Sequence, residues 1–252
     1  MPVLTVLSPA RPDGTSFIDQ AYASLVGQRM PAGWDWEWVL QVDALDAALP
    51  AGLDDPRIRV GHGPAGGPSV ARNLGLARAA GSLVRNLDVD DVLLPGALAR
   101  DIDTLDADPA LGWVTSVAVD LGAHERPDAG SPGPAHPHPP AGRIRRGEIR
   151  QWVTERSWAL PVHPTTLCAR RDLLLALGGW TALPSGGDTA LLLALDAVSD
   201  GFFLDQPSVR YRKHPQQVTA QPLHSRSDLL AARRTLSLDR ARALGELGWQ
   251  YR

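Results

Sequence analysis

Three aspartates occupy four positions of the segment NLDVDDVLLPGAL, residues 86–98. They are Asp88, Asp90 and Asp91, and an apolar stretch lies on each side of them. Like charges this close repel one another, so the cluster indicates that something positive binds beside it. Two carboxylates in a D-x-D arrangement supply the oxygen ligands that Mg²⁺ and Mn²⁺ prefer, and such ions often bind substrate phosphates as well. The same pattern also occurs in solvated turns, and the three residues alone do not decide between these alternatives.

A second acidic residue strengthens the interpretation as a site. Asp43 ends the apolar segment WEWVLQVD (residues 36–43), and the aspartate cluster ends the segment SLVRNLDV (residues 82–89). Both segments are predicted strands, and ligands of parallel sheets bind at the carboxyl ends of the strands. We therefore predict that two separate strands deliver carboxylates to the same edge of one sheet.

The elements that must position these residues alternate along the chain. Strands are predicted at residues 2–8, 36–43, 57–63, 82–89 and 111–122, and helices at residues 16–28, 66–81 and 95–107. Helices follow at 147–158, 186–201 and 225–251, a strand that runs into a helix is predicted at 164–180, and a further strand at 202–215. This alternation predicts an α/β fold with a mostly parallel, doubly wound, Rossmann-like sheet flanked by helices. Ser69 is a plausible N-cap of the second helix.

Two segments depart from this regular pattern. Residues 124–142 are rich in Pro, Gly and His, so we predict a flexible excursion in which His136 and His138 are solvated and bind no metal. The central strand carries Arg85 and Asn86, although such a strand is normally apolar. A buried arginine needs a partner, so we expect Arg85 to pair with a neighbouring acid and Asn86 to face a nucleotide.

Composition excludes several classes of protein. The chain has 252 residues and a net charge of −3, which gives no general electrostatic footprint for nucleic acid. Its one cysteine, Cys168, lies in an apolar run and excludes an intrachain disulfide. No apolar run approaches the roughly 18 residues of a membrane span. The first residues carry no basic segment typical of a signal peptide, so we expect a cytoplasmic protein without an integral membrane part.

The chain resembles the family 2 glycosyltransferases, which have the GT-A fold, over most of its length. The most specific segment is DPRIRVGHGPAGGPSVARNLGLARAAGSLVRNLDVDDVLLPGAL, in which a helix start of the type G-x-S-x-A-R-N-x-G precedes a strand and D-x-D-D. Other matching segments follow the family's order: residues 4–28, 34–43, 163–180, 186–195 and 208–215.

The resemblance implies an inverting transfer of a sugar from a nucleotide-diphosphate sugar, with a UDP-sugar favoured, to an acceptor hydroxyl or amine. The acceptor would be a sugar, a lipid or a small molecule. The cofactor would be Mn²⁺ or Mg²⁺. Asp90 matches the direct metal ligand, and Asp88 matches the acid on the ribose side. His214 could complete the metal shell, or its loop could simply pair with Asp205 or solvent.

The family's donor-binding positions are matched by five further residues. Asp43 resembles the aspartate that reads the nucleotide base, and Pro9 and Arg11 lie in the loop that lines the base pocket. Arg72 matches the arginine that reaches the nucleotide, and Arg212 matches a motif near the diphosphate. A guanidinium group suits either base carbonyls or phosphate oxygens.

Asp188 matches the family's catalytic base, which takes the proton of the acceptor hydroxyl. Its alternative role is an N-cap of the helix at 189–198. The family commonly has a Glu-Asp pair here, whereas this chain has Gly187 before the aspartate. His163 and Trp180 lie where relatives approach the acceptor, with a structural histidine and a packed core tryptophan as their alternatives.

We predict one GT-A domain over residues 1–222, with a nucleotide-sugar-binding half at 1–122 and an acceptor-binding half at 143–222. The C-terminal tail, residues 223–252, is a predicted helix that could cap this domain or form a homodimer through its exposed face.

Three rival functions were weighed. A relative that binds nucleotide sugar but has lost turnover is favoured by the missing acid before Asp188. A phosphatase of the haloacid dehalogenase type also uses D-x-D after a strand, but it places the motif on its first strand and needs a later lysine, and Lys213 is the one lysine here. A nucleotidyltransferase would need a glycine-rich loop with Arg or Lys after the first strand, and none is present.

Overall fold

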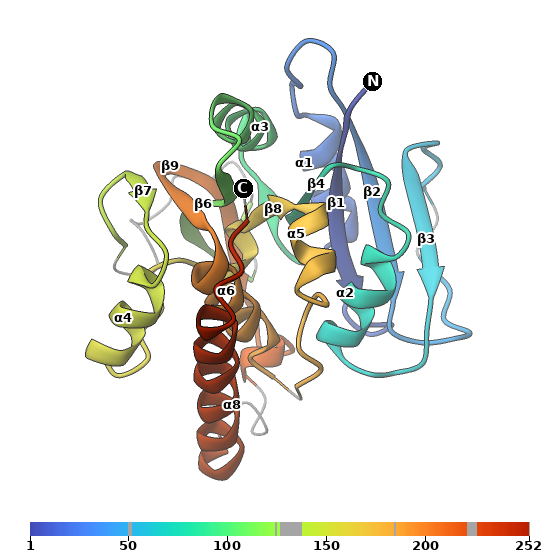
Figure 1. The fold of residues 1–252 in the computed structure, drawn as a ribbon. Helices are drawn as coiled ribbons and strands as arrows, with labels where there is room; N and C mark the ends of the chain where they lie inside the picture. Colours follow the sequence, from blue (N-terminus) through green and yellow to red (C-terminus); the bar gives the residue numbers. More distant parts are fainter. Residues whose placement is uncertain (50–51, 124, 127–137, 184, 221–225, 252) are drawn as a thin grey trace.

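The two strands that end in the predicted acidic residues lie on either side of β1 in one nine-stranded sheet (Figure 1). The computed structural model describes residues 1–49, 52–123, 125–126, 138–183, 185–220 and 226–251, and His136 lies outside them. The strand order is β3-β2-β1-β4-β8-β6-β9-β5, and β7 pairs with β9. The strands are β1 (Val3–Ala10), β2 (Asp35–Val42), β3 (Ile58–His62), β4 (Leu83–Asn86), β5 (Val92–Leu93), β6 (Leu111–Gly122), β7 (Gly142–Ile144), β8 (Cys168–Arg170) and β9 (Asp200–Lys213).

Parallel pairing predominates in this sheet. The strands β3, β2, β1 and β4 form a wholly parallel half, and β6 runs parallel to β9 along most of its length. Antiparallel pairing is confined to contacts made by the short strands β5, β7 and β8. The predicted mostly parallel α/β sheet is confirmed, as is the strand expected at the start of residues 164–180, which is β8; the sequence pattern did not indicate β5 and β7.

Helices cover both faces of the sheet. Successive residues of β1 point to opposite faces of the sheet. Leu4 joins the core under α1 and α3, and Leu7 joins the core under α2, α5 and α6. The helices are α1 (Ile18–Val26), α2 (Pro68–Leu76), α3 (Ala97–Ala107), α4 (Glu148–Glu155), α5 (Arg171–Ala176), α6 (Gly187–Val198) and α8 (Ser227–Glu246), with 3₁₀ turns η1 (Pro164–Thr166) and η2 (Val218–Ala220). None of the helices in the described ranges is long and apolar enough to cross a membrane.

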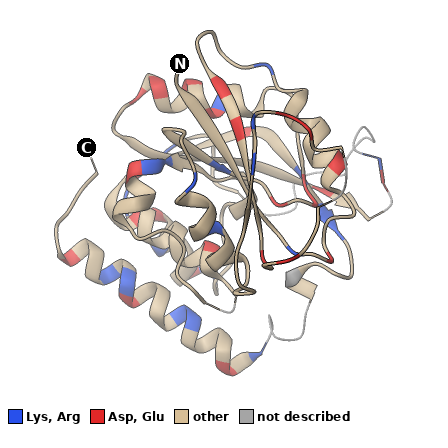
Figure 2. Cartoon of the chain, turned by 90° about the vertical axis from the view of Figure 1, so that its right-hand side faces the viewer, with Lys and Arg blue, Asp and Glu red and all other residues tan. Residues whose placement is uncertain are grey.

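The C-terminal helix α8 packs along α6 (Figure 1). Its Arg240 side chain donates to Thr181 Oγ1 at 2.6 Å, and beyond its end the Tyr251 amide donates to the Val198 carbonyl at 2.9 Å. Charged residues of both signs occur along this helix (Figure 2). Of the two roles predicted for the tail, this packing supports the capping role.

The buried charge on β4 has a partner in the fold. The Arg85 side chain is fully buried, and its Nη1 lies 3.1 Å from Asp101 Oδ2 on α3. It also donates to the Thr166 carbonyl and, at 2.7 Å, to Ser208 Oγ on β9. Burial raises the pKa of Asp101 to about 6, although Arg85 acts to lower it. The predicted pairing of Arg85 with a neighbouring acid is confirmed.

The neighbour of Arg85 does not have its predicted orientation. The Asn86 side-chain amide donates to the Pro164 carbonyl at 3.3 Å, and the residue is 2% exposed. Asn86 therefore ties β4 to η1 and does not face a nucleotide.

We expect Arg85→Leu to lower the free energy of unfolding by about 3–5 kcal/mol, because it leaves the buried Asp101 carboxyl without its ion-pair partner. The double variant Arg85→Leu/Asp101→Leu should lose much less than the sum of the two single variants, since it removes both charges. Urea unfolding of the four proteins in a double-mutant cycle measures this coupling. Additive losses would show that the two side chains do not stabilise each other.

Candidate active site

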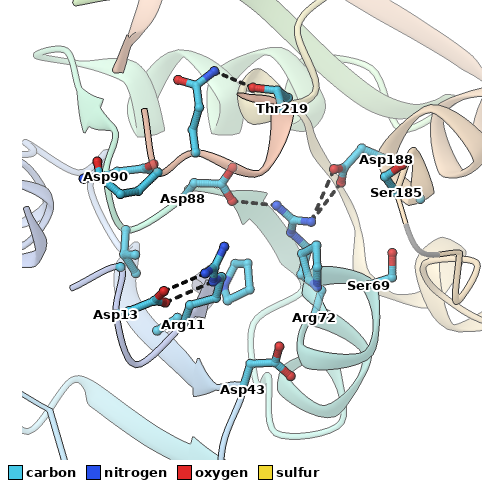
Figure 3. A pocket seen from close by; sticks show the side chains of 18 of the residues that line it. Arg11, Asp13, Asp43, Ser69, Arg72, Asp88, Asp90, Ser185, Asp188 and Thr219 are labelled. Carbon is cyan, nitrogen blue, oxygen red and sulfur yellow. Dashed lines mark hydrogen bonds and ion pairs between the residues drawn. The ribbon is translucent and has the colours of Figure 1, made fainter. Parts of the chain in front are cut away.

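A cavity opens at the carboxyl ends of β1, β2 and β4, where the loops of the parallel half of the sheet meet (Figure 3). Its walls come from the loop after β1, the segment after β4, the N-termini of α2 and α6, and the segment that follows β9. The sequence-predicted residues that line it are Pro9, Arg11, Asp43, Arg72, Asp88, Asp90, Asp188 and His214. The prediction that Asp43 and the D-x-D aspartates reach one edge of the sheet is confirmed.

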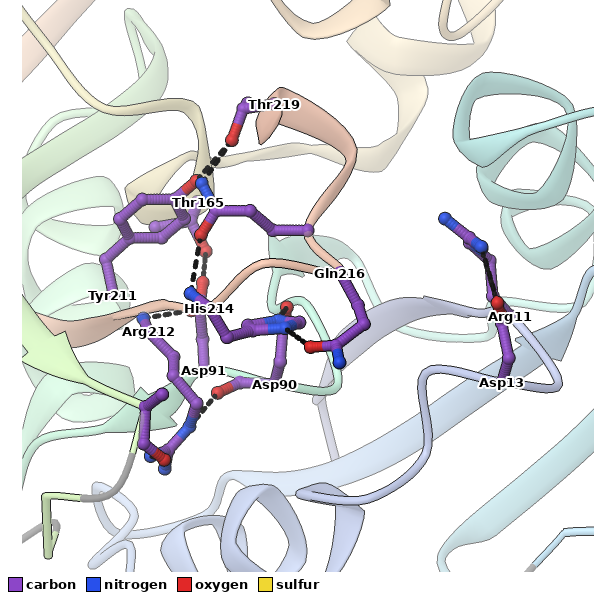
Figure 4. Close-up of polar contacts among 12 residues, drawn as sticks. Arg11, Asp13, Asp90, Asp91, Thr165, Tyr211, Arg212, His214, Gln216 and Thr219 are labelled. Carbon is purple, nitrogen blue, oxygen red and sulfur yellow. Dashed lines mark hydrogen bonds and ion pairs between the residues drawn. The ribbon is translucent and has the colours of Figure 1, made fainter. Parts of the chain in front are cut away.

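The three clustered aspartates have different surroundings. Asp91 is fully buried and accepts hydrogen bonds from Thr165 Oγ1 at 2.7 Å and from the Arg212 amide at 2.9 Å (Figure 4). Burial raises its pKa well above the ordinary value, and the charges of Asp90 and Asp88 add to this shift. Asp91 therefore joins η1 to β9, and Asp88 and Asp90 are the members of the cluster that reach the cavity.

Among the described residues, these aspartates form the one group whose acidic, histidine or cysteine side chains could share a metal ion, with ligand atoms within 4.8 Å of one another. The pKa of Asp88 is raised by burial and by repulsion from Asp90 and Asp188, against the charge of Arg72. A divalent cation would relieve this repulsion, and all the donors are hard carboxylate oxygens. The residues therefore fit an ion such as Mg²⁺ or Mn²⁺.

His214 lies beside the expected metal ligand. Its Nε2 is 2.8 Å from Asp90 Oδ2, and its Nδ1 is 3.1 Å from Gln216 Oε1 (Figure 4). The ring packs against Phe17, with ring centres 5.5 Å apart. The segment after β9 is thereby tied to the D-x-D aspartates, as the predicted place of His214 in the metal shell requires.

Arg72 connects the two sides of the cavity (Figure 3). Its Nη2 donates to Asp88 Oδ1 at 2.6 Å, and its Nη1 lies 3.2 Å from Asp188 Oδ1. Burial opposes the charge of this guanidinium, but Asp188 and Asp88 outweigh it and raise the pKa of Arg72 above its ordinary value. Arg72 is 4% exposed, and its positive charge is paired with these two carboxylates.

Asp188 is the second residue of α6, and the cap is Gly186. The alternative interpretation of Asp188 as the N-cap is therefore wrong, because Asp188 lies inside the helix. Instead Asp188 Oδ1 accepts the indole N–H of Trp180 at 2.9 Å, and the side chain borders the cavity. The positive end of the helix dipole favours a charged carboxylate in this first turn.

The glycine before Asp188 has a steric cause. A Cβ at position 187 would overlap Ser69 Oγ and lie 3.0 Å from the Thr181 carbonyl. The N-termini of α2 and α6 approach each other at this point, so the glutamate common in the family has no room. Ser69 itself is not the N-cap of α2, because Gly67 holds that position and Pro68 begins the helix.

The base-pocket residues make local contacts. The carboxylate of Asp43 accepts the amides of Gly66 and Gly67 at 2.8 and 3.0 Å, which fixes the loop ahead of α2. Arg11 forms a two-pronged ion pair with Asp13 in the loop after β1, at 3.1 and 2.6 Å. All three residues border the cavity, and the Arg11 and Asp13 side chains are 37% and 68% exposed.

Three predicted site residues do not line the cavity. Arg212 is 1% exposed and donates to the Asp90 carbonyl at 3.0 Å and to Gln20 at 2.6 Å, so its predicted contact with a diphosphate gives way to a structural role. Trp180 is 1% exposed and cannot offer its ring to an acceptor sugar. His163 begins η1, where its Nδ1 accepts the Thr165 amide at 3.3 Å.

Several residues that border the cavity were not predicted. The end of β9 and the segment after it contribute a group that sequence analysis passed over: Tyr211, Gln216, Gln217 and Thr219. Ser185, which precedes α6, is a further one. Tyr211 lies within the segment YRKHP (residues 211–215), Gln216 and Gln217 follow it directly, and Ser185 directly precedes GGD (residues 186–188). This position in the sequence is the signal that could have found them.

Comparisons with known proteins agree with this geometry. The family model for glycosyl transferase family 2 matches residues 41–163. The structure of residues 1–349 of TarS from S. aureus in complex with UDP-GlcNAc has a TM-score of 0.68 at 18% identity, covering 95% of this chain and 66% of that one. The same TarS fragment without the nucleotide sugar gives 0.61 at 18% identity over 84% and 60%, and a longer TarS structure gives 0.61 at 16% over 86% and 37%.

The chain thus spans less than two thirds of these TarS chains. No curated protein matches the sequence significantly. The family match covers the Asp43, Arg72 and D-x-D positions, and the structural matches show the GT-A fold. Residues 41–163 therefore match glycosyl transferase family 2, and the chain has the GT-A fold.

Proposed function

We propose that the protein is an inverting, metal-assisted glycosyltransferase that moves a sugar from a nucleotide-diphosphate sugar to a hydroxyl or amine of an acceptor. One observation carries the proposal. A single cavity holds two acidic centres, Asp88 with Asp90 on one side and Asp188 on the other, with Arg72 between them. A transfer of this kind needs one centre for the leaving diphosphate and one for the attacking acceptor.

The donor would occupy the part of the cavity formed by residues 1–122. Asp43, Arg11 and Pro9 stand where the nucleotide base would enter, beyond the aspartates that would meet the diphosphate. The TarS structures that share this fold were determined with UDP-GlcNAc and with UDP, which favours a UDP-sugar here. Residues 143–222 would supply the acceptor side.

Asp90 and Asp88 would hold the divalent ion, with His214 at its edge. When bound, the ion would neutralise the charge that develops on the departing diphosphate. Asp91 has a different role, because each of its carboxylate oxygens already accepts a hydrogen bond within the protein.

Asp188 would act as the general base. Its carboxylate would take the proton of the acceptor hydroxyl or amine while that atom forms a bond to the anomeric carbon of the sugar. The bond from this carbon to the diphosphate breaks on the opposite face, so the configuration inverts. Arg72 would hold Asp188 and Asp88 at a fixed spacing, which keeps the base and the leaving group on opposite sides of the reacting carbon.

A second candidate is a relative that binds nucleotide sugar without turnover. This candidate is favoured by Gly187. Ser69 leaves no room for a side chain at this position, so the chain lacks an acid that is common in the family. The two candidates differ in substrate consumption. Binding of UDP-sugar with Mn²⁺, without transfer or slow hydrolysis of the donor, would support the second candidate.

Asp90→Ala should abolish the gain in UDP affinity that Mn²⁺ provides, because it removes the carboxylate that reaches the cavity beside His214. Calorimetry with Mn²⁺ and with EDTA measures this gain. Asp13→Ala is the control: it removes another carboxylate from the same cavity, but one paired with Arg11, and should retain the Mn²⁺ effect. An undiminished Mn²⁺ effect in Asp90→Ala would refute the metal assignment.

Asp188→Asn should leave UDP-sugar affinity nearly unchanged and lower turnover by roughly 100-fold or more, the scale of losing a positioned general base. Asparagine keeps the size and an oxygen acceptor for Trp180, so the melting temperature should change little. Donor hydrolysis by water can serve as the assay until an acceptor is identified. Turnover close to that of the wild type would remove Asp188 from the mechanism.

A further inference from the structure

We propose that Asn73 and Trp180 are positioning residues for Asp188, joined to it by a continuous chain of hydrogen bonds that starts on α2. The inference rests on the proposed function, since it assigns the residues that orient the proposed base. Trp180 was predicted to touch the acceptor, and its burial assigns it this different role.

The first link joins α2 to the turn after α5. Asn73 Nδ2 donates to the Trp180 carbonyl at 2.8 Å, and Asn73 Oδ1 accepts the Trp180 amide at 2.8 Å. One side-chain amide thus satisfies both backbone groups of a single residue. The approach requires the glycine at position 179, which has φ +68° and where a Cβ would overlap Asn73 Oδ1.

The second link joins this turn to α6. The Trp180 ring is 1% exposed, so packing fixes its orientation, and its Nε1 donates to Asp188 Oδ1 at 2.9 Å. Arg72 lies against the same carboxylate, with its guanidinium carbon 6.0 Å from the Trp180 ring centre. Two buried donors therefore restrict the rotation of Asp188.

The arrangement leaves one oxygen of the base available. Oδ1 accepts the indole N–H, and Oδ2 accepts a longer hydrogen bond of 3.3 Å from Arg72 Nη1 and keeps a second lone pair for the acceptor proton. A general base works only when its oxygen lies within hydrogen-bond reach of the acceptor proton, and small misplacements are costly. Fixing Oδ1 gives Oδ2 a defined position.

Neighbouring residues of α2 serve both sides of the cavity. Arg72 contacts Asp88 and Asp188 directly, and Asn73 reaches Asp188 through Trp180. Hydrogen bonds and an ion pair therefore connect the R-N dipeptide of α2, the G-G-W turn and the G-G-D segment at the start of α6. Substitution of Trp180, which lies between Asn73 and Asp188, should therefore disturb Asp188 and leave the donor site unchanged.

Trp180→Phe removes the indole N–H and keeps most of the buried ring. We expect kcat to fall about 10-fold while KM for the UDP-sugar and the affinity for UDP stay within 2-fold. Asn73→Ala should show the same split between kcat and KM. The control is Trp113→Phe: Trp113 is fully buried in the same core cluster, and within the described part of the chain its Nε1 has no hydrogen-bond partner.

Trp113→Phe should lower the melting temperature about as much as Trp180→Phe but leave kcat unchanged. An equal loss of kcat in both variants would show that Trp180 acts through core packing alone and would overturn the proposal. An unchanged kcat in Trp180→Phe, with transfer measurable in the wild type, would overturn it as well.

A readout without turnover separates this inference from the proposed function. In a ¹⁵N–¹H spectrum of the eight tryptophan indoles, Trp180→Phe and Trp113→Phe each identify one resonance by its loss. Asp188→Ala should move the Trp180 resonance and increase its solvent exchange, with no change at Trp113. An unmoved Trp180 resonance would overturn the inference even if the wild type transfers sugar, whereas a wild type that neither transfers sugar nor hydrolyses the donor would overturn the proposed function itself.

Discussion

The ion pairs of Arg72 are the interaction on which the rest of the site depends. One buried guanidinium contacts Asp88, which follows β4, and Asp188, which begins α6. The carboxylates of Asp88, Asp90 and Asp188 would repel one another where little water screens them, and the positive charge of Arg72 offsets part of that repulsion. Burial, with repulsion from Asp90 and Asp188, raises the pKa of Asp88 despite Arg72, and a further cation on this acidic side of the cavity would oppose that shift.

The surrounding fold supplies rigidity through buried polar contacts. Arg85 and Asp101 join β4 to α3, and Asp91 joins the start of β5 to η1 and β9. Such groups cost free energy when they lose water, so they are tolerated where partners are complete. These contacts fix the D-x-D segment to the sheet. Asn73 and Trp180 make the corresponding hydrogen bonds on the Asp188 side of the cavity.

The sequence predicted the sheet and the acidic edge because both follow from local patterns: apolar strands ending in Asp43 and Asp88, and a family motif across the second helix. It also anticipated that Arg85 needs an acid. It could not separate Asp91 from its neighbours, place Arg212 beneath the cavity, or show that Trp180 is buried, since each depends on contacts between residues far apart in the chain. The crowding of Gly187 by Ser69 is another contact of this kind.

The central claim is that this cavity binds a nucleotide diphosphate through a divalent ion held at Asp88 and Asp90. Crystals grown with UDP and Mn²⁺ test it most directly, because anomalous scattering locates manganese without reference to the protein. We expect an anomalous peak within about 2.5 Å of an Asp90 carboxylate oxygen, and the nucleotide base near Asp43. UDP bound in the cavity with no manganese at Asp90 or Asp88, or a manganese peak elsewhere, would contradict the account.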